Sequence, residues 1–571
     1  MKNHKNLSKQ ELMTRQDIPC VHLGGKFVPL ESRVKSSHSG SRKKPAEQLL
    51  ATVVMGMNLV NTAAPLAVLA ASEQKMSVVP QPVRSEAEPL DYAMLPQLAD
   101  VVDRAIFARA YATDYDGNAS VADMAAGDKQ TITAGQSGTV STMSGGQQDI
   151  SSGGTGTVST MNNGGSQFVD DGGTGAVSTM SGGKQKMYAG TGTIGTMSGG
   201  SQAVYEGGTA IVDKMLAGEQ SIEYGGTGTV SIMSGGTQKV WMGGTGTVIT
   251  MSSGVQTIHS GGTGAITMMS DGWQEISGGT GTVSTLSGGR QNAYSGGNAT
   301  VSTMMNGVQS VKEDAMGTVS TMSGGVQSIS SGGTGIVSTM SGGEQSVSSG
   351  GTGTVGVMLA GKQFVDVGGM GTVSIMSGGS QSIVEHGSGT ISTMSGGGQT
   401  VYSGGTGTIN TMNSGLQWLL SSGTCTIDVM HDGMQDIRSG GTGTIDTMNA
   451  GSQFISSGGS GTVSTMSGGT QVMSGGTGTI NTMNSGLQWL LSSGTCTIDV
   501  MHDGMQDIRS GGTGTIDTMN AGSQFISSGG SGTVSTMSGG TQVMSGGTGT
   551  INTMNSGLQW LLSSGTCTID V

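Results

Sequence analysis

A short unit of apolar and polar positions, GGTGTVSTMSGGxQxI, recurs from about residue 137 to the end of the chain. Each unit holds a β-branched run, such as residues 157–160, and a second short run, such as residues 167–169, and pairs of glycines bound both runs. Glycine allows the positive φ angles of tight turns, whereas β-branched residues favour extended backbone. The unit therefore predicts two short strands joined by tight turns, and its glycine pairs exclude a helical repeat.

Three positions of each unit stay apolar, and Val158, Met161 and Val169 represent them. Val158 and Met161 are three residues apart, so simple alternation along a strand cannot place both on one face. We expect a corner between them that turns both side chains into a core. Gln167 shares the parity of Val169, so its amide is predicted to point inward or into a turn, where stacked copies would form an amide ladder.

The glutamines make the period visible, because most of them recur at a spacing of roughly 18 residues. Counting from Gln148 to Gln559 gives 24 units, and a few of these units are shorter or longer by a single position. So long a series of short units predicts an all-β fold, a right-handed β-helix or β-solenoid of about 24 rungs of ~18 residues. At about 4.8 Å per rung, this solenoid would be roughly 115 Å long. The predicted structural glutamine ladder includes Gln238, Gln256, Gln274, Gln291, Gln309, Gln327 and Gln345.

Residues 1–71 are predicted to be an extended signal peptide. Residues 1–48 are basic, the stretch Leu49–Ala71 carries no charge, and polar sequence returns at Ser72. A positive region, an apolar stretch and small residues at its exit are typical of an export signal, with cleavage expected after Ala70 or Ala71. A membrane anchor is the alternative, because the apolar run is about long enough to span a bilayer. Cleavage would leave no membrane span in the mature chain.

Two further boundaries follow from the pattern. Residues 72–136 lack the repeat and are predicted to be a leader or cap, whereas residues 137–571 form the solenoid. Within the solenoid, residues 403–473 and 474–544 are identical over 71 positions, and residues 545–571 begin a third copy. This identity indicates a recent tandem duplication or an artefact of gene assembly. Because the chain stops inside a unit, we expect the natural protein to continue.

Composition and charge exclude several classes of protein. The 107 glycines do not fall at every third position, which excludes collagen, and 34% hydrophobic residues with 11% charged residues argue against a disordered polyelectrolyte. Residues 1–71 carry ten Lys/Arg and four Asp/Glu, a balance of +6, so the net charge of −13 leaves about −19 for the rest. Such an acidic body would repel phosphate backbones, and nucleic acid is not an expected partner.

Candidate chemistry is sparse along the chain. Three of the four cysteines, Cys425, Cys496 and Cys567, are copies of one position, and no CxxC or Cys/His cluster supports a disulfide framework or a zinc site. The GGTGT segment lacks the GK[ST] of a phosphate loop, and Thr157 stands where a calcium-binding nonapeptide needs Asp. The 40 methionines recur mostly once per unit, which favours core packing over a soft-metal site.

No catalytic residue, cofactor site or metal site is therefore predicted, and the chain is not expected to be an enzyme. The densest charges, at residues 170–171 and 312–314, are interpreted as solvated turns. Tyr205, Trp241 and His259 follow the second strand at outward positions and are candidate contact points. The most notable aromatic residues are three copies of one position, Trp418, Trp489 and Trp560.

Units of roughly 18 residues with Gly-Gly corners, a Thr/Ser-rich first strand and a GGxQxI/V second strand resemble the passenger repeats of AIDA-type autotransporter adhesins. The resemblance covers residues 137–571. It implies a β-helical passenger exported by type V secretion, displayed on the outer membrane, and active in adhesion, autoaggregation and biofilm formation. It also implies a Ser/Thr glycosyltransferase as a partner. The sequence lacks the C-terminal translocator barrel of that family, so a truncated gene is one expectation.

Three classes of function remain open at the level of the sequence. A repetitive adhesin would bind other copies of itself, or host and abiotic surfaces, through many weak contacts. A purely structural spacer would lift another part of a larger surface protein away from the cell. The threonine rows would also suit ice or crystal binding. In each case the protein is expected at the cell surface, on the outer membrane or outside the cell.

Overall fold

The computed structural model describes residues 112–570. The expected signal peptide, its cleavage at Ala70 or Ala71, and residues 72–111 of the expected leader lie outside the described residues. Throughout the described part, the regular structure consists of β-strands, with no helix. Accordingly, no helix of residues 112–570 is long and apolar enough to cross a membrane.

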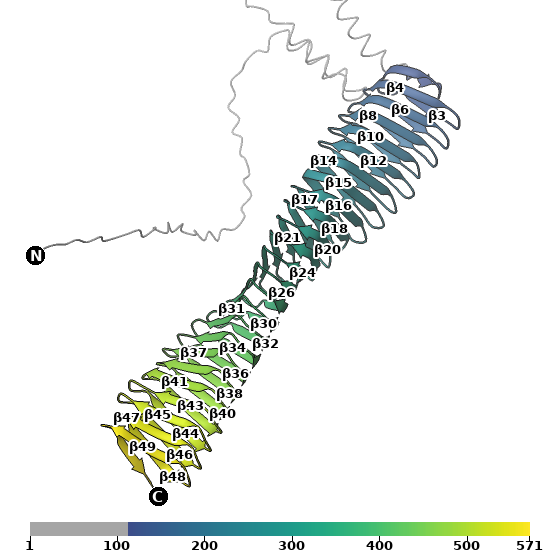
Figure 1. The fold of residues 1–571 in the computed structure, drawn as a ribbon. Coiled ribbons are helices and arrows are strands. Elements are labelled where there is room, and N and C mark those ends of the chain that lie inside the picture. Colours follow the sequence, from purple (N-terminus) through teal and green to yellow (C-terminus); the bar gives the residue numbers. More distant parts are fainter. Residues whose placement is uncertain (1–111, 571) are drawn as a thin grey trace, which may run out of the picture. The chain divides into compact units, whose positions relative to one another are not determined.

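One turn of the chain contributes a long strand and a short strand. In a typical turn these are β6 (Thr155–Met161) and β7 (Ser166–Val169). The next turn contributes β8 (Thr174–Met180), which pairs in parallel with β6, and β9 (Lys184–Met187), which pairs in parallel with β7. The repetition of this pairing builds a parallel β-solenoid of about 25 turns with ~18 residues per turn, which confirms the predicted fold class (Figure 1).

The long strands stack into one continuous ladder. The ladder also includes β2 (Ser120–Met124), β4 (Ser137–Met143), β10 (Thr191–Met197), β12 (Thr209–Met215), β16 (Thr263–Met269), β18 (Thr280–Leu286), β20 (Asn298–Met304), β22 (Met316–Met322), β24 (Thr334–Met340), β26 (Thr352–Met358), β28 (Met370–Met376), β30 (Ser388–Met394), β32 (Thr406–Met412), β34 (Thr424–Met430), β36 (Thr442–Met448), β38 (Ser460–Met466), β40 (Thr477–Met483), β42 (Thr495–Met501), β44 (Thr513–Met519), β46 (Ser531–Met537), β48 (Thr548–Met554) and β50 (Thr566–Ile569).

The short strands form a second ladder. Its other members are β1 (Asp114–Tyr115), β3 (Lys129–Ile132), β5 (Gln147–Ile150), β11 (Ser201–Val204), β13 (Glu219–Ile222), β17 (Trp273–Ser277), β19 (Arg290–Tyr294), β21 (Val308–Val311), β23 (Val326–Ile329), β25 (Glu344–Val347), β27 (Lys362–Val365), β29 (Ser380–Ile383), β31 (Gly398–Val401), β33 (Leu416–Leu419), β35 (Met434–Ile437), β37 (Ser452–Ser456), β39 (Thr470–Ser474), β41 (Leu487–Ser492), β43 (Met505–Ile508), β45 (Ser523–Ser527), β47 (Thr541–Ser545) and β49 (Leu558–Ser563). In two turns, both strands merge into β14 (Thr227–Val240) and β15 (Thr245–Ile258).

The ladders begin before residue 137, inside the range assigned to a leader or cap. Strand β2 pairs with β4, and β3 pairs with β5, in the same parallel register as the later turns. Gln130 of β3 is fully buried and occupies the first position of the glutamine ladder. The turn before it lacks the Gly-Gly pair of the repeat, and the sequence pattern is weak there for that reason.

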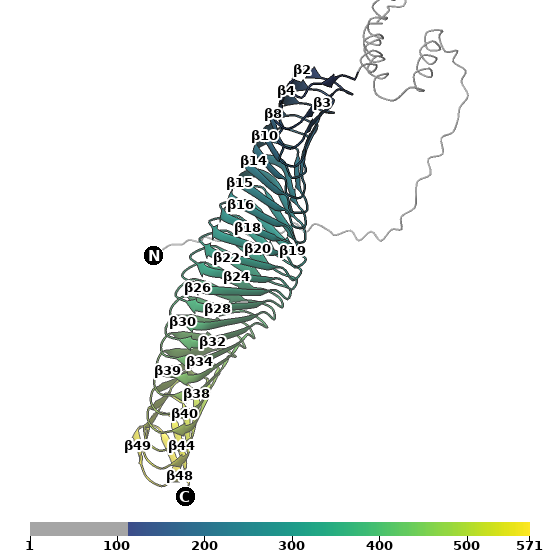
Figure 2. The same cartoon turned by 90° about the vertical axis from the view of Figure 1, so that its right-hand side faces the viewer.

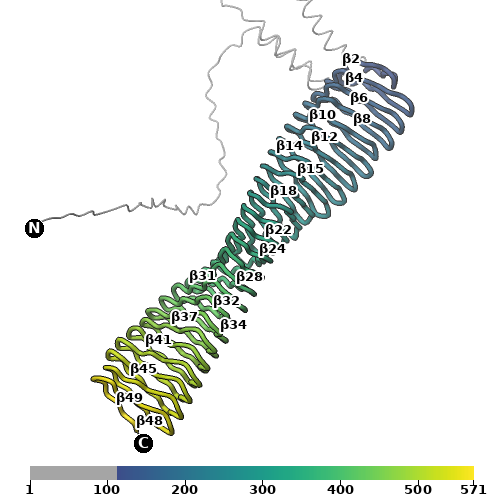
Figure 3. Tube along the Cα trace, viewed as in Figure 1, coloured from purple at the N-terminus to yellow at the C-terminus, as the bar shows by residue number. Residues whose placement is uncertain are grey.

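The core is made where each turn bends. The Cα pairing between β6 and β8 includes Val158 and Thr160 but omits Ser159, so the strand turns a corner at that residue. As a result Val158 and Met161 both point inward, with exposures of 1% and 0%. Val169 of the short strand is also 0% exposed, and it belongs to a second column of core residues. The turns stack one upon another, as the second view and the tube show (Figures 2 and 3). This stacking extends both columns of core residues along the solenoid.

A buried ladder of glutamine amides joins consecutive turns. Nε2 of Gln345 donates to Oε1 of Gln327 at 2.7 Å, and Nε2 of Gln327 donates to Oε1 of Gln309 at the same distance. The bonds run in this one direction from Gln559 back to Gln130. In many turns the second N–H donates to backbone, as Gln327 does to the carbonyl of Gly317 at 3.1 Å. A buried amide is costly unless it is hydrogen-bonded, and here the glutamine of each turn supplies a hydrogen bond to the glutamine of the next.

The inward glycine of the long strand makes room for this ladder. A methyl group at Gly335 would overlap Cδ1 of Ile329 and crowd Oε1 of Gln327. A few turns carry Ala or Cys in place of this glycine, for example Ala210 and Cys425. In one of them the replacement is compensated, because Ala299 replaces the glycine and Ala293 replaces the Val or Ile six residues earlier. The small side chain at 293 leaves space for the methyl group at 299.

The outer turns explain the remaining glycines. After β23, Ser331 and Gly332 adopt φ angles of 52° and 79°. Two consecutive residues with positive φ form the tight turn that Gly, Asn and Asp favour, and Ser at the first position accepts some strain. The turn tips also pair along the solenoid, since the amide of Ser331 donates to the carbonyl of Ser349 at 3.0 Å.

Replacing Gln327 by Met should destabilise the surrounding turns, because it leaves Oε1 of Gln309 without its donor and removes the side-chain acceptor of Nε2 of Gln345. The expected local cost is about 1–3 kcal/mol, the range for a buried polar group left unpaired. Hydrogen exchange of the amides in β21, β23 and β25 should accelerate roughly 5- to 150-fold, which is that cost expressed as a rate ratio. The outward variant Ser328→Ala is the control, and equal exchange in both variants would contradict the structural role of the ladder.

The pair Ala293 and Ala299 gives a second prediction. The single variant Ala293→Ile should overpack the core against the methyl group of Ala299 and lose about 1–3 kcal/mol. The double variant Ala293→Ile/Ala299→Gly restores the Ile–Gly pair of the other turns and should recover most of this loss. Urea denaturation followed by circular dichroism measures both variants. Additive effects of the two substitutions would show that the residues do not compensate each other.

Candidate binding surfaces

The long strands present two outward columns of hydroxyl groups. In β6 these are Thr155 and Thr157, which flank the inward Gly156 and pair with the same positions of the neighbouring turns. Within residues 388–550 both columns carry Ser or Thr in every turn. The first column is mostly exposed and the second is half-buried. The columns are therefore a regular hydrogen-bonding surface without a pocket.

An aromatic column follows the short strands in the N-terminal half. The rings of Tyr188 and Tyr205 are stacked in adjacent turns, with centroids 4.8 Å apart, and those of Trp241 and His259 are stacked at 3.8 Å. Glu223 occupies the turn between the two pairs. Hydrogen bonds link this turn to its neighbour, because Nε1 of Trp241 donates to Oγ of Ser221 and this hydroxyl donates to Glu223, each at 3.2 Å.

Two titratable side chains of this column have shifted pKa values, and both shifts favour the neutral form. Burial raises the pKa of Tyr205, and the negative charge of Glu223 raises it further. Burial lowers the pKa of His259, with a smaller effect from the positive charge of Lys239. The lowered pKa of His259 favours its neutral imidazole, which stacks on Trp241. Glu219 and Lys239 form a surface ion pair at 2.7 Å.

The C-terminal half of the short-strand ladder presents a different surface, which we call the C-terminal apolar face. It consists of the outward side chains of β33, β35, β37, β39, β41, β43, β45 and β47. Its central column reads Trp418, Asp436, Phe454, Val472, Trp489, Asp507, Phe525 and Val543. Leu416, Leu487 and Leu491 lie beside the tryptophans of this column.

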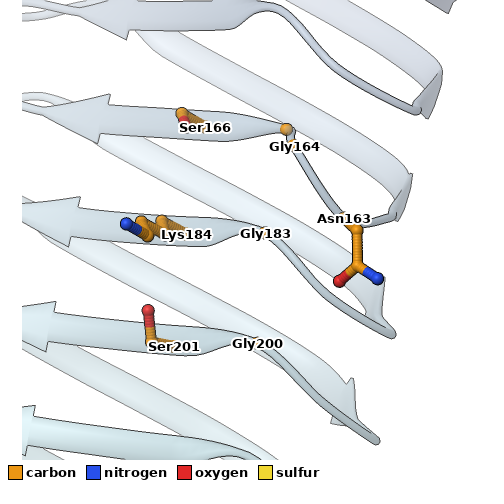
Figure 4. Close-up of a pocket in the computed structure, with 8 residues that line it drawn as sticks. Asn163, Gly164, Ser166, Gly183, Lys184, Gly200 and Ser201 are labelled. Carbon is orange, nitrogen blue, oxygen red and sulfur yellow. The ribbon is translucent and has the colours of Figure 1, made fainter. Parts of the chain in front are cut away.

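One shallow hollow of about 440 Å³ lies over the turns before β7, β9 and β11 (Figure 4). Four glycines form half of its lining, and Asn163, Ser166, Lys184 and Ser201 form the other half. These residues include no carboxylate, imidazole or thiol that could act as a general base or a nucleophile. The hollow is a groove between stacked turns and not a site for chemistry.

The other candidate groups do not converge either. Residues 112–570 contain no group of three His, Cys, Asp or Glu side chains that could hold a metal ion. Cys425 and Cys496 are buried in successive copies of the repeat, and burial raises the pKa of both thiols well above the usual value, so they are poor nucleophiles. Glu313 and Asp314 lie at a turn tip, with φ angles of 52° and 60°.

The positions expected from the sequence lie in the interior or on these surfaces. Glutamines 238, 256, 274, 291, 309, 327 and 345 are all 0% exposed and are joined by hydrogen bonds of 2.6–2.8 Å. Trp418 and Trp489 lie on the apolar face described above. Sequence reasoning missed the alternation of large and small residues along that face, which becomes visible only when equivalent positions of successive turns are read as one column.

The fold and these surfaces define an extended repeat protein, a parallel β-solenoid whose outward residues form columns. No protein-family model and no curated protein matches the chain. A solved structure that does match is the crystal structure of a TibC-catalysed hyper-glycosylated TibA55-350 fragment, with 21% identity. The match covers 80% of this chain and 99% of that one, with a TM-score of 0.13. At so low a TM-score, the similarity supports no inference about function.

The stacked pair predicts a fluorescence change with pH. Protonation of His259 should quench the emission of Trp241, because an imidazolium at 3.8 Å is an efficient quencher. Since the pKa of His259 is below its ordinary value of 6.5, the change should have its midpoint below pH 6.5. The neutral stack is thus favoured above that pH and lost as the pH falls through the lowered pKa. The variant His259→Gln should abolish the transition, and a midpoint at or above pH 6.5 would contradict the lowering of this pKa by burial.

Proposed function

We propose that the protein is an exported, repetitive adhesin that acts at the cell surface, on the outer membrane or outside the cell. The observation that carries this proposal is the arrangement of the outward residues. They form columns in register over many turns, and residues 112–570 contain no group of three His, Cys, Asp or Glu side chains that could hold a metal ion. Such a surface suits many equivalent weak contacts, with other copies of the chain or with host and abiotic surfaces.

Repetition strengthens weak contacts. Once one turn is bound, the neighbouring turns are held at a high effective concentration next to the same surface, so the avidity exceeds the affinity of one turn by about 10²–10⁴. The stiffness of a hydrogen-bonded ladder helps, because little conformational entropy is lost when further turns engage. Adhesion, autoaggregation and biofilm formation are the activities that this physics supports.

The remaining parts of the proposal rest on the sequence. Residues 1–71 would be the export signal, and residues 72–136 a leader whose last part already forms the first turns of the solenoid. Residues 137–571 would be the passenger of a type V secretion system. The exposed hydroxyl columns of the long strands would be the acceptors for a Ser/Thr glycosyltransferase. The spacer function differs from adhesion in one testable respect, since a spacer needs length but no contacts of its own.

Deletion of residues 403–473 provides a test with an intact fold. Ser474 begins the same sequence as Ser403, so the junction is identical to the natural one and four turns are removed without a change of register. For a multivalent adhesin, cell attachment to a solid surface should fall several-fold and not in proportion to length. A matched deletion of residues 309–380, four turns of the other half, is the control for length.

Attachment under shear, scored for cells that display equal amounts of each chain, measures the effect. A spacer predicts unchanged attachment for both deletions, because the rod stays long and its own surface makes no contacts. Purified wild-type protein added in solution should compete with the cells if the chain itself adheres. Absence of competition together with unchanged attachment would overturn the adhesin proposal.

A further inference from the structure

Along the C-terminal apolar face, protruding and recessed side chains alternate regularly, so the face is complementary in shape to a second copy of itself. In its central column the aromatic residues are partly exposed, with Phe454 at 39% and Phe525 at 37%. The residues between them are shielded, with Asp436 at 7% and Val472 at 8%. Large and small residues therefore alternate turn by turn, giving aromatic ridges about 9.6 Å apart with troughs between them. The guanidinium groups of Arg438 and Arg509 lie on the aspartates of two of these troughs.

The face is also electrically neutral, unlike the chain as a whole, which has a net charge of −13. Its two acids are each paired with a nearby arginine. Nε of Arg438 donates to Oδ2 of Asp436 at 2.9 Å, and Nε of Arg509 donates to Oδ2 of Asp507 at 3.0 Å. The same columns in the N-terminal half carry unlike charges at Lys129, Asp149, Lys184, Lys186, Glu219, Lys239, Glu275 and Arg290. Two copies could meet across the neutral face without electrostatic repulsion.

We propose that a second copy of this chain docks on the C-terminal apolar face, with the aromatic ridges of each copy in the troughs of the other. The proposal rests on the proposed function and names the partner and the surface for self-association. A shift of one turn brings every ridge opposite a trough, and the period is the same on both partners. Shape complementarity of this kind is what a self-complementary interface requires.

The size of the face sets the strength of the contact. Eight turns of about 4.8 Å and five residues of about 3.3 Å each give roughly 600 Å² per copy. The total of about 1,200 Å² lies at the lower end of specific protein interfaces. A pair of isolated chains should thus associate weakly and reversibly, while many chains on facing cells would gain from avidity.

The chemistry of the face argues against other occupants. A glycan needs many hydrogen-bonding groups, but the central column offers only aromatic and aliphatic side chains and two acids already bonded to arginine. An anionic membrane attracts clusters of free Lys and Arg, and in this face both arginines are paired.

Sedimentation of the full exported chain over a range of concentrations tests the proposal. The weight-average mass should rise with concentration from that of one chain towards that of two. The double variant Trp418→Lys/Trp489→Lys should raise the dissociation constant of the dimer at least 100-fold. The variant Ser310→Lys/Ser328→Lys is the matched control, because it adds the same charge at the equivalent column outside the face. It should associate as the wild type does.

Each other outcome overturns the proposal. Wild-type protein that stays monomeric up to the solubility limit would do so, as would equal association of the two lysine variants. Binding of the wild type to vesicles of phosphatidylcholine and phosphatidylglycerol, without self-association, would assign the face to lipid instead. If the lysine variant loses its β circular dichroism, Trp418→Thr/Trp489→Thr keeps strand-forming residues and should show the same loss of association.

The shear assay separates this inference from the proposed function. If cells attach normally while the purified chain stays monomeric, the proposal that the apolar face is a self-association site is overturned and the adhesin proposal stands. Unchanged attachment in both deletions, no competition by the purified chain and a monomeric chain would together overturn both proposals. The expected result is that cells displaying the double lysine variant still attach to a solid surface but no longer aggregate with one another.

Discussion

The structure depends on the buried hydrogen bond between the side-chain amides of successive turns. An amide in a dry core is unfavourable unless both its donors and its acceptor are used, so each turn needs its neighbours in register. The ladder fixes that register, because a shift of one residue would place Gln327 on the outside and bury a serine. It also explains why most turns keep an inward glycine in the long strand, because an added methyl group there would crowd the amide and the neighbouring Val or Ile.

Much of this architecture could be predicted from the sequence because the repeat states each constraint many times. The regular period and the glycine pairs predicted the solenoid, which the structure confirms. The three-residue spacing of Val158 and Met161 demanded a bend, and the break in pairing at Ser159 is the physical form of that bend. Parity with Val169 is the signal that locates Gln167 in the interior.

Other features could not be read along the chain, because they join residues one turn apart. The exchange of Gly and Val or Ile for Ala299 and Ala293 looks like two unrelated irregularities until the turns are stacked. The relief of the C-terminal apolar face is likewise invisible in sequence order, where Trp418 and Phe454 are 36 positions apart. The first turns, around Gln130, lack the glycine pairs and so fall below what a repeat pattern can detect.

The coiling of the chain has a mechanical consequence. Each turn stores ~18 residues within one rung of the axis, about 4.8 Å, yet the same residues pulled straight would span about 60 Å. Tension along the axis loads the ladder at its end, so turns would peel off one after another while those behind keep their hydrogen bonds. Each turn that is released lengthens more than tenfold. A tether built in this way would therefore dissipate the work of a sudden pull before any surface contact has to break.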